Sequence, residues 1–79
     1  MTVSALVLTL DPEPVSRTRV LERLRGDARL CLGDRVLDRL PVVAMTTSCA
    51  AGDALFGELG AIEGILKVDV VAVDFSEDV

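Results

Sequence analysis

The sequence contains no histidine, no tryptophan and no tyrosine, and its only aromatic residues are Phe56 and Phe75. Histidine is the most common general base and a frequent zinc ligand, so its absence excludes histidine-based catalytic triads and most zinc sites. With two aromatic rings in 79 residues, the core has to be packed from aliphatic side chains. A chain of this length forms one domain with a small core.

Cysteine is also scarce. Cys31 and Cys49 are the only two, and they form no C-x-x-C pair. Two cysteines are too few for the disulfide framework of a small secreted domain, which favours a reducing compartment. The six glycines form neither a G-x-G-x-x-G motif nor a loop ending in GK[ST], so no phosphate cradle is expected. We therefore expect no enzyme activity, no cofactor and no metal.

Long apolar runs are missing as well. The stretch from Met1 to Leu10 has no basic start and is followed by Asp11 and Pro12, which is unlike a secretory signal. No run approaches the roughly 20 apolar residues of a membrane span. We expect a cytoplasmic protein.

The net charge is −5, and it is unevenly distributed. All basic residues except Lys67 precede Leu40, whereas the second half carries seven acids. An acidic surface repels phosphate backbones and attracts cations, so nucleic acid is not expected as a partner and a basic peptide is. The acidity could equally serve only to keep a small protein soluble.

Periodicity and turn residues predict six elements. Alternation marks three strands, a helix follows each of two turn or cap segments, and the last strand carries apolar residues on both of its faces. The arginines of the first helix are expected on its solvated side, with Gly26 as its stop. The expected elements are a strand over Val3–Leu10, a helix opening at Asp11–Pro14, an edge strand over Ala28–Gly33, a strand over Leu40–Thr46 with Pro41 at its start, a helix over Ala50–Ile62 capped by Thr46–Ser48, and a strand over Ile65–Phe75.

This order predicts an α+β, ferredoxin-like βαββαβ sandwich spanning residues 1–79 as a single domain. Right-handed crossovers place both helices on one face of a four-stranded antiparallel sheet. The other face, which we call the open face, then has no cover. It is expected to be mainly apolar, whereas a solvated sheet face normally carries polar residues.

The last strand provides the clearest sign that the open face is apolar, because it has apolar residues on both of its faces. Alternation predicts Val68, Val70 and Ala72 toward the core. The expected residues of the open face are Ala5, Val7, Thr9, Cys31, Val43, Met45, Asp69, Val71, Val73 and Phe75. A contiguous apolar patch of this kind marks a binding or dimer surface.

Several segments of the chain resemble the NapD family, the cytoplasmic assembly chaperones of periplasmic nitrate reductase. They are Ser4-Ala-Leu-Val-Leu8 at the start of a strand, the glycine after the first helix, the strand Leu40 to Met45, and Ile62-Glu-Gly-Ile-Leu-Lys-Val-Asp-Val-Val71. The resemblance spans nearly the whole chain in element order and length.

The resemblance implies a protein that holds the twin-arginine signal peptide of a molybdenum-containing reductase before export, with the peptide bound to the sheet as a helix. Such a peptide joins a basic segment to an apolar one, so its receptor needs an apolar platform bordered by carboxylates. Asp69 is the expected arginine partner, with Glu77 and Asp78 beyond the strand. The expected peptide-binding residues are Ala5, Val7, Thr9, Val43, Met45, Asp69, Val71, Val73 and Phe75.

Two other uses of the same fold remain open. One is a small-molecule regulatory module of the ACT type, although the segment from Asp11 to Pro14 lacks the glycine expected after its first strand. The other is a structural homodimer that buries its open faces against each other.

Overall fold

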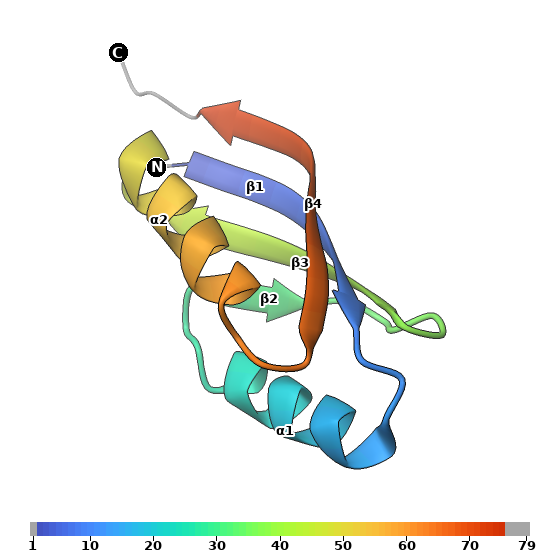
Figure 1. Ribbon diagram of the computed structural model, residues 1–79. Helices are drawn as coiled ribbons and strands as arrows, with labels where there is room; N and C mark the ends of the chain where they lie inside the picture. Colours follow the sequence, from blue (N-terminus) through green and yellow to red (C-terminus); the bar gives the residue numbers. More distant parts are fainter. Residues whose placement is uncertain (1, 76–79) are drawn as a thin grey trace.

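The computed structural model describes residues 2–75, and the side chain of Phe75 lies outside this description. Its elements are β1 (Thr2–Leu10), α1 (Pro14–Arg25), β2 (Leu30–Leu32), β3 (Arg39–Thr46), α2 (Cys49–Gly60) and β4 (Ile65–Phe75) (Figure 1). The strands form one antiparallel sheet in the order β2-β3-β1-β4. This confirms the predicted α+β, ferredoxin-like arrangement.

Both helices pack on the same face of the sheet, where they form one core with the alternate residues of the strands. Residues of β1 alternate strictly between buried and half-buried, as period-2 patterning requires. The buried apolar side chains are Leu6, Leu8, Leu10, Val20, Leu24, Leu40, Val42, Ala44, Leu55, Leu59 and Ile65. In the described part of the chain, the opposite face of the sheet has no helix on it. No helix in residues 2–75 is long and apolar enough to cross a membrane.

Side chains close the amino ends of both helices. The Glu13 carboxylate accepts hydrogen bonds from the backbone N–H groups of Val15, at 3.2 Å, and Ser16, at 2.7 Å. The Ser48 hydroxyl accepts one from the Ala51 N–H at 3.1 Å. These bonds satisfy donors that the helices leave unpaired, so both helices begin at positions that the sequence specifies.

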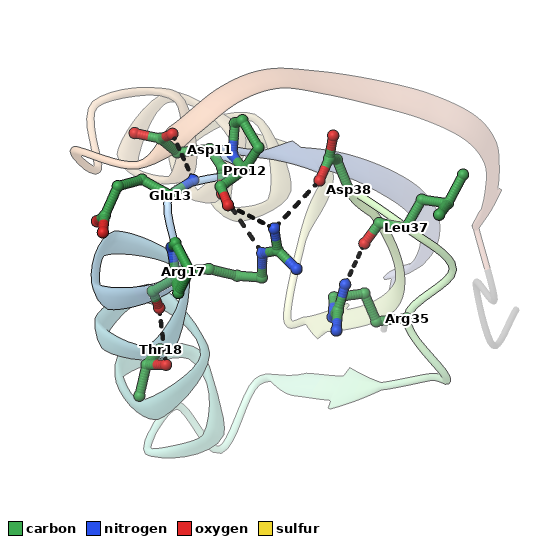
Figure 2. A network of polar contacts seen from close by, with 9 residues as sticks. Asp11, Pro12, Glu13, Arg17, Thr18, Arg35, Leu37 and Asp38 are labelled. Atoms are coloured by element: carbon green, nitrogen blue, oxygen red, sulfur yellow. Dashed lines mark hydrogen bonds and ion pairs between the residues drawn. The ribbon is translucent and has the colours of Figure 1, made fainter.

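Arg17 corrects the expectation that the arginines of α1 are solvated. Its guanidinium donates to the Pro12 carbonyl at 2.7 Å and to the Asp38 carboxylate at 3.3 Å, and its side chain is only 20% exposed (Figure 2). Arg17 thus ties the start of α1 to the loop that precedes β3. The Nε and Nη2 groups of Arg17 therefore donate within the protein.

β2 is shorter than predicted. The Asp27 carboxylate accepts a hydrogen bond from the Arg29 N–H at 2.9 Å, and the Asp27 carbonyl accepts one from the Leu30 N–H at 3.1 Å. These two bonds hold the backbone in a turn, so pairing with β3 begins only at Leu30. The strand is nevertheless at the edge of the sheet, as predicted.

Pro41 lies inside β3 and not at its start. Its carbonyl accepts a hydrogen bond from the Gly33 N–H at 2.8 Å, and the Met45 N–H donates to the Arg29 carbonyl at 2.8 Å, so alternate residues of β3 direct their backbone groups toward β2. The proline nitrogen therefore faces the side where β2 has already ended. No donor is lost from the paired part of the sheet, which is why this proline is tolerated.

A candidate interaction face on the sheet

The open face consists of four rows of side chains that run across β3, β1 and β4. Residues paired in register point to the same side of a sheet, so the strand register defines each row. From one end to the other, the rows are Arg39, Thr9 and Lys67; Pro41, Val7 and Asp69; Val43, Ala5 and Ala72; and Met45, Val3 and Asp74. Cys31 of β2 extends the third row, because it pairs with Val43.

A bulge in β4 corrects the prediction for the end of this strand. Leu6 pairs with Val70 and Ala5 pairs with Ala72, which leaves Val71 as an extra residue. One inserted residue reverses the alternation beyond it. Ala72, predicted to point into the core, therefore lies on the open face.

Val73 is corrected by the same bulge. It pairs with Ser4, which is buried on the helix side, so Val73 belongs to that side and not to the open face. The backbone of Phe75 pairs with Thr2, and its side chain lies outside the described part of the molecule. Figure 1 shows β4 bending strongly, so that its last part runs alongside the start of β1.

The structure brings the centre of the predicted platform together in one shallow groove of about 370 Å³ on the open face. Val71 and Val43 are 65% and 40% exposed, and Met45, in the next row, is 43% exposed. The groove is lined by Ala5, Leu6, Val7, Cys31, Leu32, Gly33, Pro41, Val42, Val43 and Val71. Thr9, Met45 and Asp69 share the face but lie outside the groove.

The predicted open face lacked six residues that belong to these rows, for different reasons. Val3, Pro41 and Lys67 follow from simple alternation in their strands, so the pattern already contained them, and Arg39 lies one residue before the predicted strand. Ala72 and Asp74 could not be found in this way, because the bulge that places them on this face depends on the register between β4 and β1.

The predicted arginine partner already has a cation beside it. The Lys67 ammonium lies 3.4 Å from the Asp69 carboxylate, and both side chains are well exposed, at 67% and 48%. An exposed pair of this kind contributes less than about 1 kcal/mol, so a bound arginine could displace it. Asp69 is therefore open to a bound arginine, which would replace Lys67 as its partner.

The two ends of the open face also differ in charge. Arg39 and Lys67 flank Thr9 in the first row, whereas Asp74 ends the fourth row beside Val3. Between them lie two rows that are apolar apart from Asp69. The face is thus a mainly apolar strip with a basic end and an acidic end.

Both cysteines are exposed, but only one lies on this face. Cys31 lines the groove, whereas Cys49 is the first residue of α2. Within residues 2–75, no group of three or more acids or cysteines is placed to hold a metal ion. The chemistry that the face offers is therefore apolar contact with charge at its two ends.

The comparisons with known proteins add nothing to these observations. No protein family, no curated protein and no solved structure matches the chain.

Proposed function

We propose that the protein binds a peptide on its open face, and that this peptide is the twin-arginine signal peptide of a periplasmic molybdoenzyme, such as nitrate reductase, held before export. The observation that carries the proposal is the apolar groove on the side of the sheet opposite both helices. The resemblance to the NapD assembly chaperones supports the identity of the peptide.

The composition of the face suits a peptide that has an apolar segment. Exposed valines and a methionine gather in one area, and such patches on small soluble proteins mark interaction sites. An amphipathic helix placed in an apolar groove is held by a few anchoring side chains. Val43 and Val71, on opposite sides of β1, are positioned to contact the same anchors.

Substitution of Val71 by glutamate tests the proposal. A charge in the middle of the groove has to be desolvated when the peptide binds, so Val71→Glu is expected to weaken binding at least about tenfold in titration calorimetry with a synthetic twin-arginine peptide. The melting temperature should hardly change, since Val71 is 65% exposed. Val15→Glu is the matched control, because Val15 is 57% exposed on α1, in the helix layer.

The two cysteines supply a second measurement on the same complex. Saturating peptide is expected to slow the alkylation of Cys31, in the groove, and to leave that of Cys49 unchanged. If Val71→Glu binds as tightly as the unmodified protein and Cys31 reacts at the same rate with and without peptide, the open face is not the receptor. If Cys31 is instead protected by raising the concentration of the protein alone, the face serves self-association.

A further inference from the structure

β4 forms a long free edge of the sheet. It has 11 residues and pairs on one side only, with β1, whereas β2 at the opposite edge has three. Two apolar side chains along its first half, Leu66 and Val70, are 63% and 47% exposed. Long edges with exposed apolar residues invite pairing with another strand, and proteins usually block them. In the described residues this edge carries neither a proline nor a covering helix, and the devices that limit pairing along it are Lys67 and the two register shifts against β1, at Leu66 and Val71.

The backbone hydrogen bonds show which groups of β4 are free. The Leu10 N–H donates to the Asp38 carbonyl, on the β3 side, at 2.7 Å, and the Asp11 N–H donates to the Gly64 carbonyl, on the β4 side, at 2.8 Å. Alternation then directs the backbone groups of Thr9 and Val7 toward β4. Their partners Lys67 and Asp69 face back toward β1. The N–H and C=O groups of Val68 and Val70 therefore point away from the sheet.

We propose that this edge pairs with the same edge of a second copy of the chain, antiparallel and with twofold symmetry about Val68. In this register the backbone groups of Val68 bond to those of Val68 in the second copy. Lys67 then stands opposite Asp69 of the second copy, and Asp69 opposite Lys67. These two are non-hydrogen-bonded pairs, in which side chains approach most closely, so each is placed for an ion pair across the seam.

Charge selects this register among its neighbours. If the centre of the pairing moves from Val68 to a neighbouring residue, Lys67 stands opposite Lys67 of the second copy, or Asp69 opposite Asp69. Like charges directly opposite each other are destabilising. If only one of the two strands slips by one residue, each pair joins side chains that point to opposite faces of the sheet. The sequence Lys67-Val68-Asp69 is therefore self-complementary in one antiparallel register.

The pairing leaves the open face free. A twofold axis perpendicular to the sheet keeps both open faces on the same side, so the dimer presents one eight-stranded sheet with two grooves. A single pair of edge strands buries less surface than the roughly 1,200 Å² of a standard stable interface, so the association is expected to be weak and dependent on concentration.

Charge substitutions at the seam test the pairing by sedimentation velocity from micromolar to millimolar concentration. Lys67→Asp makes both positions acidic, and Asp69→Lys makes both basic, so each variant alone is expected to associate at least about tenfold more weakly than the unmodified chain. An equimolar mixture of the two should form a heterodimer. The double variant that exchanges the two residues should dimerise like the unmodified chain, because its pairs are again opposite in charge.

Val68→Pro removes the outward donor without taking a hydrogen bond from β1, and it is expected to abolish the dimer while the monomer stays folded by circular dichroism. The pairing is refuted if the mixture associates no better than its components, or if the unmodified chain is monomeric at millimolar concentration. An association that survives Val68→Pro but is lost in Val71→Glu belongs to the open face. Peptide binding is measured separately, so either proposal can fail without the other.

Discussion

At the scale of single residues, Gly64 is the glycine at which an added Cβ would make the shortest contacts. It has a positive φ of +100°, and a Cβ added there would lie 2.5 Å from Val20 Cγ2 and 2.8 Å from Ser16 Oγ. Both the backbone strain and the overlap with α1 oppose a side chain. Gly64→Ala is therefore expected to lower the free energy of unfolding by about 2–4 kcal/mol, measured by urea denaturation.

Gly57 offers a matched control in the same experiment. It lies within α2, and a Cβ added there would meet nothing within 4 Å. Gly57→Ala should raise the free energy of unfolding by about 0.5–1 kcal/mol, because alanine favours the helix. A loss of stability at both positions would show that local space around Gly64 does not explain its requirement for glycine.

At the scale of elements, Arg29 connects the turn after α1 to α2. Its guanidinium donates to the Asp27 carboxylate at 2.7 Å and to the Glu58 carboxylate at 3.3 Å. The hydrogen bond from Arg29 holds the pKa of Asp27 below its ordinary value of 3.8. A carboxyl whose pKa is lower in the folded protein adds stability above its unfolded pKa and loses this contribution as the pH falls through the folded value.

Asp27→Asn is therefore expected to be less stable than the unmodified chain near neutral pH, by about 1 kcal/mol or less, since the pair is partly exposed. The gap should close as the pH falls from about 5 to below the folded pKa of Asp27. Thermal unfolding across this range measures it. In an Arg29→Met background the same substitution should give a smaller pH-dependent gap, because only the hydrogen bond from the backbone N–H of residue 29 to the Asp27 carboxylate remains, and a gap of undiminished size there would assign the effect to another group.

The same scale shows what the sequence could and could not predict. β1 and β3 were predictable because their residues alternate strictly between the two faces, and α2 was predictable because Ser48 caps its start. β2 was predicted too long because Ala28 and Arg29, which continue the alternation of the strand, lie in a turn held by Asp27. Such competition between a side chain and the strand ladder is not visible in hydrophobic periodicity.

The bulge at Val71 is the clearest limit of the sequence. No glycine or proline marks it, and the run from Val68 to Val73 is apolar on both faces, so a shift by one residue leaves the pattern equally good. The register is decided by pairing with β1, where Ala5 stands opposite Ala72. The fold could therefore be predicted from the sequence, whereas the residues that β4 contributes to the open face could not. By contrast, the contact of Lys67 with Asp69 could have been predicted, since residues two apart share a face of a strand.

At the scale of the whole molecule, the opposite charges at the two ends of the open face determine in which direction a bound peptide lies on it. From Val3 to Thr9 the face spans about 20 Å along β1, which equals about 13 residues of helix. The acidic end at Asp74 suits arginines, whereas Arg39 and Lys67 at the other end repel them. A twin-arginine peptide bound as proposed should therefore place its basic segment near Asp74 and its apolar segment over the groove.

A spin label attached to the amino end of the peptide tests this direction by broadening nearby amide signals of the protein. The broadening is expected to be strongest in the row of Met45 and Val3 and weakest in the row of Thr9, and a label at the other end of the peptide should reverse the order. If both labels broaden the same row equally, charge does not orient the peptide. Asp74→Asn should then leave affinity unchanged, whereas an oriented complex should lose several-fold in affinity, because its arginines give up their only carboxylate in that row.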